Sequence, residues 1–177
     1  RSKGRFLSIL TLMMLGSLAL VGLKVTTPNM HRTAQRFIDQ QEMLDLAVMG
    51  DLGLDKTDQE ELQGLTGASL EFSYLTDVTL DGKDEAVRLF SIPETISRFQ
   101  LASGRLPQKE DEVALAAFWK DRYQIGDQLR IHEKAGSPSV LKTKNYRIVG
   151  FVKSAEMWSE KDLGQARSGS GSLDAYG

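Results

Sequence analysis

An uninterrupted apolar stretch lies near the N-terminus of the chain. Residues 6–23, FLSILTLMMLGSLALVGL, are 18 positions without a charged side chain. A helix of that length spans roughly 27 Å, close to the ~30 Å hydrocarbon core of a bilayer. Arg1, Lys3 and Arg5 precede the stretch, and the first acid is Asp39. The pattern predicts a helix that crosses the bilayer, with a cytoplasmic N-terminus and an exported remainder.

Two other interpretations of this stretch stay open from the sequence: a cleaved signal peptide, or a buried helix of a soluble protein. The apolar region of a signal peptide is usually only about 7–15 residues long and is followed by a small-x-small cleavage site. Here the run is longer, and Lys24 follows it directly without a clear site of that kind. We therefore interpret residues 1–25 as a basic cytoplasmic start and a retained transmembrane helix.

A second helical pattern begins four residues after the span. Thr27 is a residue type that caps helices, and Pro28 suits the first position of a helix. One face at helical spacing then carries Met30, Ala34, Phe37, Ile38 and Gln41. A break or kink is expected at Pro28, because proline disfavours the helical conformation at the preceding residue. We predict a stalk helix in residues 26–44, with Thr27 and Pro28 as the candidate hinge.

Strand-like runs and turns alternate through residues 45–177, the predicted extracytoplasmic domain. The runs lie at residues 45–52, at two segments between 69 and 92, at 112–115, at Leu129 and Ile131, and at 146–152, the last apolar enough to be central. Asp81-Gly82 between two runs is a strong hairpin signal. Residues 92–101 are predicted to be irregular or briefly helical.

Short helices are expected between these runs. Thr57-Asp58-Gln59-Glu60 matches a capping box and predicts a helix that ends near Gly64 or Gly67. Residues 116–122 contain further helix-forming side chains. Strand pairs mixed with short helices, without regular βαβ alternation, predict an α+β domain with a mixed sheet.

The C-terminal residues have a different composition. Residues 165–177, QARSGSGSLDAYG, are rich in Gly and Ser and predict a flexible loop. Residues 173–176 look like the start of another strand. We therefore expect the domain to be truncated at its C-terminal end, as in a fragment of a longer protein.

Charge and composition narrow the possible functions. The net charge of −2 gives no basic footprint for nucleic acid. Without the three N-terminal cations, 19 cations remain against 24 acids, a net charge of −5. That balance favours a mildly acidic soluble domain over one attracted to anionic lipid. There is no cysteine, which excludes disulfides and thiolate metal sites.

No side-chain pattern predicts catalysis, a cofactor or a metal. His31 and His132 lie far apart and lack partners at a recognisable ligand spacing. No G-x-S-x-G motif is present, and the run at residues 168–172, SGSGS, lacks the Gly-Lys-Ser/Thr of a phosphate loop. The charged residues 109–112, KEDE, are interpreted as a solvated turn. We predict that the chain is not an enzyme.

Met157 and Trp158 are the candidate partner surface. They precede the Gly- and Ser-rich segment, and methionine and aromatic residues are enriched at protein interfaces. Packing in the core is the more common role for both residue types, and it stays an alternative here.

The order of these segments resembles FtsX-like permeases of ABC transporters, of the large Gram-positive kind, with a MacB-like extracytoplasmic domain. RSKGRFLSIL resembles the first transmembrane helix, and VTTPNM, DLAVMGDLGL and TDQEEL look like the segments that follow it. GRLPxxxxEVAL, YxIGDxL and YxIVGFV resemble parts of the MacB-like domain. The motif positions, which are scaffold in that family, are Gly104, Arg105, Pro107, Glu112, Gly126, Asp127 and Gly150.

The resemblance implies a permease subunit whose exported domain is inserted after the first of four or more membrane helices. A separate cytoplasmic ABC ATPase would hydrolyse ATP, and the first helix and stalk would transmit its movement outward. Members of the family act on lipoproteins, antimicrobial peptides or cell-wall hydrolases, so an exported peptide, a lipoprotein or a cell-wall factor is the implied partner. Two alternatives stay open: a single-pass anchored binding module or adhesin, and an anchored hydrolase with a dispersed site.

Overall fold

A computed structural model describes residues 2–50, 53–133, 140–157, 159, 163–167 and 171–177. The chain divides into two compact units, Arg1–Gln40 and Gln41–Gly177, and each is described by itself.

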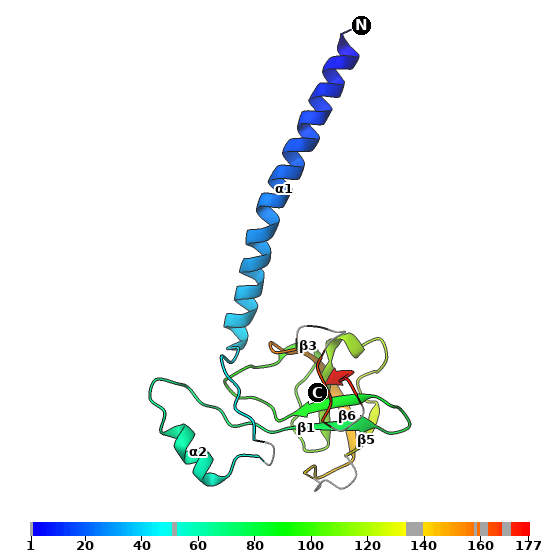
Figure 1. Cartoon of the computed structure of the whole chain (residues 1–177). Helices are drawn as coiled ribbons and strands as arrows, with labels where there is room; N and C mark the ends of the chain where they lie inside the picture. The colour runs from blue at the N-terminus through cyan, green and yellow to red at the C-terminus, as the bar shows by residue number, and fades with distance from the viewer. Residues whose placement is uncertain (1, 51–52, 134–139, 158, 160–162, 168–170) are drawn as a thin grey trace. The chain divides into compact units, whose positions relative to one another are not determined.

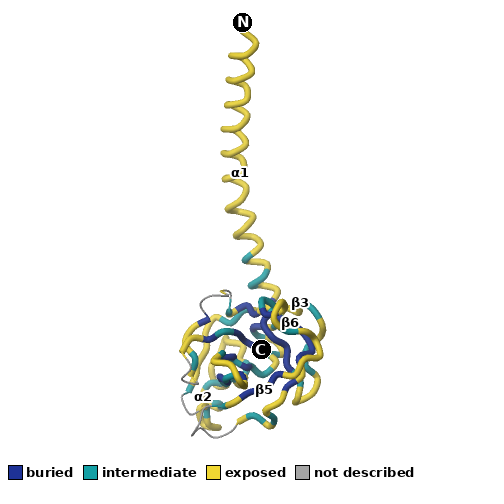
Figure 2. The backbone as a smooth tube through the Cα atoms, turned by 90° about the vertical axis from the view of Figure 1, so that its right-hand side faces the viewer, coloured by how far each residue is buried: buried dark blue, intermediate teal, exposed yellow. Residues whose placement is uncertain are grey.

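The first unit is almost entirely helix α1, Lys3–Gln41, whose last residue belongs to the second unit. Its most apolar 18-residue window has a mean hydropathy of 2.3, and none of that window is buried in the protein (Figure 2). α1 is therefore long and apolar enough to cross a membrane, as the sequence pattern predicts.

The predicted start of a new helix at Pro28 is wrong, because α1 continues through this residue without a break. Proline removes only the hydrogen bond to the carbonyl of Lys24. The hydroxyl of Thr26 donates to the Gly22 carbonyl at 2.7 Å, which adds a contact in the same turn. One missing bond does not end a helix of 39 residues. The stalk is thus continuous with the span, and the hinge role of Thr27 and Pro28 stays a prediction.

The second unit is built on a mixed seven-stranded sheet (Figure 1). Its strands are β1 Leu75–Leu80, β2 Ala86–Phe90, β3 Gln100–Gly104, β4 Glu112–Ala116, β5 Gln128–His132, β6 Asn145–Lys153 and β7 Ala175–Tyr176. The order is β3-β6-β5-β1-β2-β7, and β4 pairs with β6 in parallel. Two short helices, α2 Lys56–Gln63 and the 3-10 turn η1 Ala117–Trp119, accompany the sheet. The α+β prediction is confirmed.

β6 is the central strand, as its apolar sequence predicts. It pairs with β5 through its first residues, with β3 through its last, and with β4 along its other edge. The β1–β2 hairpin also forms as predicted, and Gly82 in its turn has a φ of +71°. The positive φ explains why Asp81-Gly82 is a reliable signal, since glycine adopts it without steric cost.

Three sequence predictions are corrected. Residues 45–50, within the predicted strand 45–52, form no strand, whereas β3 begins inside the segment expected to be irregular. The helix expected in residues 116–122 is only the turn η1. α2 forms, but its capping box joins Asp55 to Asp58 instead of Thr57 to Glu60.

The C-terminal segment is attached to the sheet on both sides of residues 168–170, which lie outside the described residues. The backbone N–H of Arg167 donates to Asp77 at 2.6 Å, and the Arg88 guanidinium donates to the same carboxylate at 2.7 Å. Gln165 and Ser172 form an isolated antiparallel bridge, and β7 runs parallel to β2. β7 confirms the start of another strand expected within residues 173–176, and the loop prediction for residues 165–177 is wrong only there.

Most of the hydrophobic core consists of side chains from the strands of the sheet. All buried apolar residues fall between Val78 and Tyr176, and Phe151, Leu115 and Ile131 are the largest fully buried side chains. In residues 42–74 no described residue is buried. The second unit thus has a packed body and a solvent-exposed N-terminal part. In Figure 2 the tube is dark blue where residues are buried and teal or yellow where they are partly or fully exposed.

Candidate functional site

The family-like motif residues meet where β3 pairs with β6. Gly104 lies opposite Gly150, and a Cβ on Gly104 would fall 2.4 Å from the Val149 carbonyl oxygen. A Cβ on Gly150 would fall 2.3 Å from the Arg105 carbonyl oxygen. Both positions therefore require glycine, because each backbone fills the space of the other's side chain. The structure brings the GRLP and VGFV motifs together as a packing contact.

Arg105 and Glu112 close the turn that contains Pro107. The guanidinium donates two hydrogen bonds to the carboxylate, one of them Nη1 to Oε2 at 2.7 Å, and the backbone N–H of Gln108 donates to the same Oε2 at 2.9 Å. The Arg105 bonds, then the Gln108 bond, lower the pKa of Glu112 from 4.5 to about 2. This pair orients the entry into β4 and leaves no free reactive group.

Gly126 and Asp127 form the other motif turn. Gly126 has a φ of +103°, and its N–H donates to the Ile148 carbonyl at 2.8 Å. The Asp127 carboxylate accepts from the backbone N–H of Gln124 at 2.8 Å. The turn directs the chain into β5, so these residues also serve the scaffold.

Gln41, the last residue of α1, belongs to the second unit and is hydrogen-bonded within that unit. The backbone N–H of Arg98 donates to the Gln41 carbonyl at 2.9 Å, and that of Ser97 donates to the Glu42 carbonyl at 2.8 Å. In return the Leu44 N–H donates to the Ser97 hydroxyl at 3.0 Å. The Arg98 bond satisfies one of the carbonyls that a helix end otherwise leaves without partners. We call residues 41–44 together with 94–98 the junction.

Both halves of the junction have an unusual backbone. Glu42 (φ 50°) and Ser97 (φ 54°) are the non-glycine residues with positive φ among those described, and they are hydrogen-bonded to each other. A left-handed conformation costs an L-residue roughly 1–2 kcal/mol. Such conformations persist where surrounding contacts enforce them, and they concentrate at functional sites. Ser97 and Gln41 are also buried, so the packing around them restrains the strained backbone of Ser97.

Glu71 fixes the outer half of the junction. Its carboxylate accepts backbone N–H bonds from Glu94, Thr95 and Ile96 at 2.7, 2.9 and 2.7 Å, and a bond from the Thr95 hydroxyl at 2.7 Å. Burial raises the pKa of this carboxyl, but the four donors outweigh it and lower the pKa from 4.5 to about 2. With the bonds to Gln41 and Glu42, five consecutive N–H groups at residues 94–98 have named acceptors.

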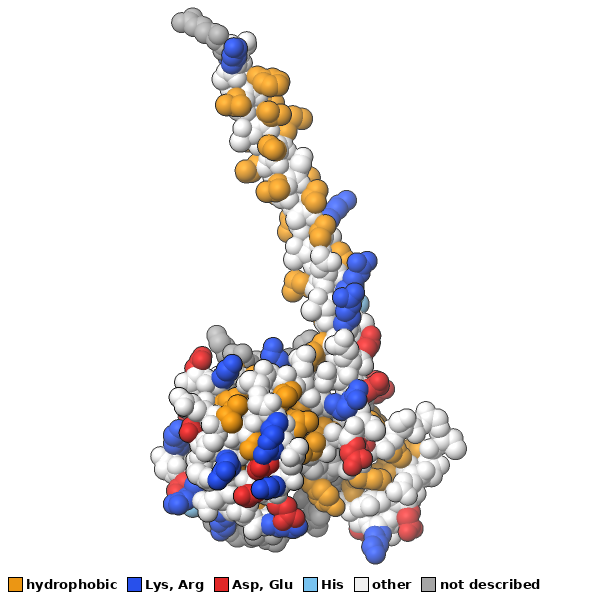
Figure 3. Space-filling view, turned by 180° about the vertical axis from the view of Figure 1, so that it is seen from behind, with side chains coloured by type: hydrophobic (Ala, Val, Ile, Leu, Met, Phe, Trp, Pro, Cys, Tyr) orange, Lys and Arg blue, Asp and Glu red, His pale blue; other side chains and the backbone are white. Residues whose placement is uncertain are grey.

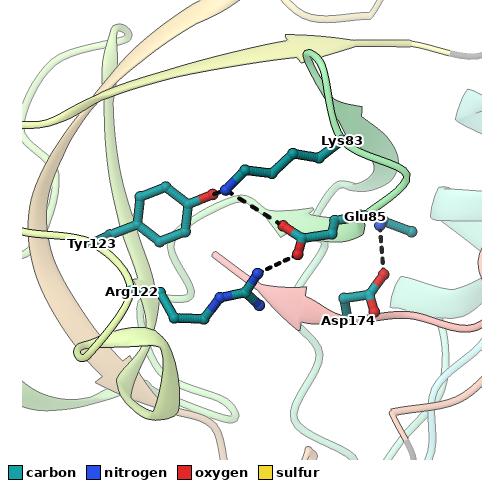
Figure 4. A network of polar contacts seen from close by, with 6 residues as sticks. Lys83, Glu85, Arg122, Tyr123 and Asp174 are labelled. Carbon is teal, nitrogen blue, oxygen red and sulfur yellow. Dashed lines mark hydrogen bonds and ion pairs between the residues drawn. The ribbon is translucent and has the colours of Figure 1, made fainter.

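A polar cluster joins the hairpin turn to two later segments (Figure 4). Arg122 donates to Glu85, Lys83 lies 3.9 Å from the same carboxylate, and the Lys83 ammonium donates to the Tyr123 hydroxyl at 2.8 Å. Asp174 accepts from the backbone N–H at the start of β2 at 2.8 Å. The charges neutralise one another, and no nucleophile stands beside a base. The cluster connects segments of the fold.

An open hollow of about 570 Å³ adjoins this cluster. Its walls are of mixed polarity and carry Leu80, Asp81, Lys83, Tyr123, Gln128, Leu129, Arg130 and Asn145. The two cations already face acids, since Arg130 lies 3.5 Å from Asp81 and Lys83 lies beside Glu85. Unpaired like charges are therefore not concentrated in this hollow.

The two histidines belong to different units. His132 Nε2 lies 2.9 Å from Asp81 on the surface, and hydrogen bonding to His132 is the main cause that lowers the pKa of Asp81. His31 is on α1. Among the described residues no group of three or more His, Cys, Asp or Glu side chains could hold a metal ion.

The other predicted positions are the partner surface and the charged turn. Met157 is partly buried and packs against the core, and Trp158 lies outside the described residues. In the charged turn 109–112, Lys142 donates to the exposed Glu110. The junction was missed by sequence reasoning, because its donors are backbone N–H groups that have no residue signature.

Comparison of the chain with protein-family models, curated proteins and solved structures finds no match.

Proposed function

We propose that this chain is the first membrane span and extracytoplasmic domain of an ABC transporter permease subunit of the FtsX-like, MacB-like type. In this role the N-terminus is cytoplasmic, and a separate ATPase subunit hydrolyses ATP. The domain passes ATP-driven movement to an exported peptide, a lipoprotein or a cell-wall factor. The order of the segments and the membrane-compatible length of α1 support the proposal.

The observation that carries the proposal is the way α1 ends. A continuous helix passes from the apolar stretch to Gln41, whose carbonyl is bound by Arg98, and Ser97 binds the carbonyl of Glu42, the next residue. A flexible tether would need neither an unbroken helix nor a capped, strained end. Displacement of the helix end acts directly on residues 94–98 and on β3, which follows at Gln100. The junction is thus suited to transmit movement.

The test uses the native protein in nanodiscs with the ABC ATPase encoded beside it. We expect ATP with vanadate to change the hydrogen-exchange rate of amides 94–98 at least threefold. The double substitution Thr33→Gly and Ala34→Gly, which loosens α1 before the junction, should abolish this response while ATP hydrolysis continues. Gln59→Gly in α2 is the matched control and should preserve it. A wild-type junction that ignores ATP contradicts the coupling role.

A single-pass anchored binding module is the second candidate, favoured by the exposed apolar side chains of residues 42–74. It needs no ATPase. In the same experiment it predicts no response to ATP at residues 94–98, together with unchanged binding of an exported partner.

A further inference from the structure

Residues 42–74, which we call the arm, leave many large apolar side chains in water. None of the arm's described residues is buried, although the arm belongs to the same unit as the packed sheet. Hydrophobic side chains are open to the surface in the part of this unit around α2 (Figure 3). The exposed ones are Leu46, Val48, Met49, Leu65, Leu70, Phe72 and Tyr74. Exposed apolar groups in this number mark a surface that another molecule covers.

Two segments of the arm have the pattern of strands but no partner strand. In residues 69–73 Leu70 and Phe72 alternate with Ser69, Glu71 and Ser73, and residues 45–49 were predicted as a strand from their own alternation. Within the described part of the chain, the backbone of these two segments forms no hydrogen bond to another residue. Unpaired N–H and C=O groups beside apolar side chains are a template for an added strand.

The inner face of residues 69–73 is already fixed. Glu71 holds the segment to amides 94–96, and Ser73 faces the small hollow beside Phe99. Leu70 and Phe72, which alternate with these residues in the sequence, are 42% and 40% exposed. The segment therefore presents an apolar row on a backbone that is held in place before any partner arrives.

The charge of the arm indicates the chemistry of that partner. The arm contains eight acids and one base, whereas residues 75–177 contain 15 of each. Nearly all of the domain's net negative charge thus lies in the part that is not packed. Like charges oppose the docking of a second arm, and anionic lipid headgroups are repelled in the same way. A basic surface is attracted.

We propose that the arm binds an extended, basic segment of a partner polypeptide by strand addition along residues 69–73, with residues 45–49 covering its apolar side chains. The backbone supplies the pairing, Leu70 and Phe72 contact every second side chain of the segment, and the arm's acids contact its lysines and arginines. This binding goes beyond the proposed function, because it requires no ATPase and holds equally for an anchored binding module.

The test measures hydrogen exchange of the full chain in zwitterionic nanodiscs with one chain per disc. The probe is the alternating peptide (Lys-Val)4-Lys. It is compared with (Glu-Val)4-Glu and with a block peptide of the same composition as the probe, in which all the lysines precede all the valines. We expect the alternating basic peptide to slow exchange of amides 69–73 at least tenfold and to bind more weakly as salt is raised. The acidic and block peptides should not protect these amides.

Phe72→Ser tests the apolar row, and it should weaken the peptide's affinity about tenfold. Val140→Ser is the matched control, because Val140 is 67% exposed and lies outside the arm; its affinity should equal the wild type's. Four results overturn the proposal: no protection by the alternating peptide, equal protection by the block peptide, equal loss in both variants, or amides 69–73 already protected without peptide. Because each disc holds one chain, the last would assign the surface to lipid or to another part of the same chain.

Discussion

Residues 75–177 contain fifteen acidic and fifteen basic side chains, and they include all of the buried apolar side chains of the second unit. Residues 42–74, the arm, contain eight acidic side chains and one basic side chain, and none of their described residues is buried. The two regions are consecutive in one unit. The difference teaches that the sheet body packs its own apolar side chains and balances its own charge, whereas the arm is held by Glu71 and has the surface that we propose a partner covers.

The largest loss of stability should come from a Phe→Ala substitution in the sheet body, and the same substitution in the arm is its comparison. Phe151→Ala removes a core side chain that is 2% exposed and should cost about 3–5 kcal/mol of unfolding free energy. Phe72→Ala removes an arm side chain that is 40% exposed and should cost less than about 1 kcal/mol. Urea unfolding of the full chain in nanodiscs measures both. Equal losses would show that the arm is packed like the body.

Glu71→Gln tests the carboxylate that joins the arm to residues 94–96 of the sheet body. It replaces a charged acceptor of four hydrogen bonds and should cost about 1–3 kcal/mol. Because the folded pKa of about 2 lies below the ordinary 4.5, the stabilisation is complete above pH 4.5 and is lost as the pH falls toward 2.

The measurement is unfolding free energy against pH for wild type and Glu71→Gln. Glu112 also titrates near pH 2, so the difference between the two curves isolates Glu71. That difference should shrink between pH 4.5 and 2. A difference that stays constant over this range would mean that the carboxylate charge does not hold the arm.

Glu60→Gln should have the smallest effect. Glu60 is exposed in an arm with seven more acids than bases, so losing its charge should change the unfolding free energy by less than about 0.5 kcal/mol, toward greater stability. Asp174→Asn is the comparison in the body, where the carboxylate accepts a backbone bond at 2.8 Å and its loss should destabilise by about 1 kcal/mol. Urea unfolding again decides, and a destabilised Glu60→Gln would contradict the charge imbalance.

Elements with local causes were predictable from the sequence. The hairpin follows from Asp81-Gly82, whose glycine adopts positive φ, and β6 follows from a continuous apolar run that suits a strand with neighbours on both edges. α2 was predictable apart from the position of its cap, because capping residues lie within a few positions of the helix they start.

Features that depend on distant contacts were not predictable. β3 has weak alternation and forms because it pairs with β6, where two glycine backbones touch. Residues 45–50 show the reverse, a strand pattern that has no partner strand among the residues that the structure describes. The junction joins Glu71 to backbone groups 23–25 residues away, and backbone donors leave no trace in the sequence.

The unbroken α1 also sets a reach. From Lys24 to Gln41 the helix continues for 18 residues past the apolar stretch, which is a rise of roughly 27 Å. An upright span would hold Gln41, the residue before the arm, about that far from the hydrocarbon boundary. A lipid-anchored partner would then need a leader of about eight extended residues to arrive there, whereas a freely diffusing one would need none. Under the proposed function, the length of a partner's tether would decide which exported proteins can bind.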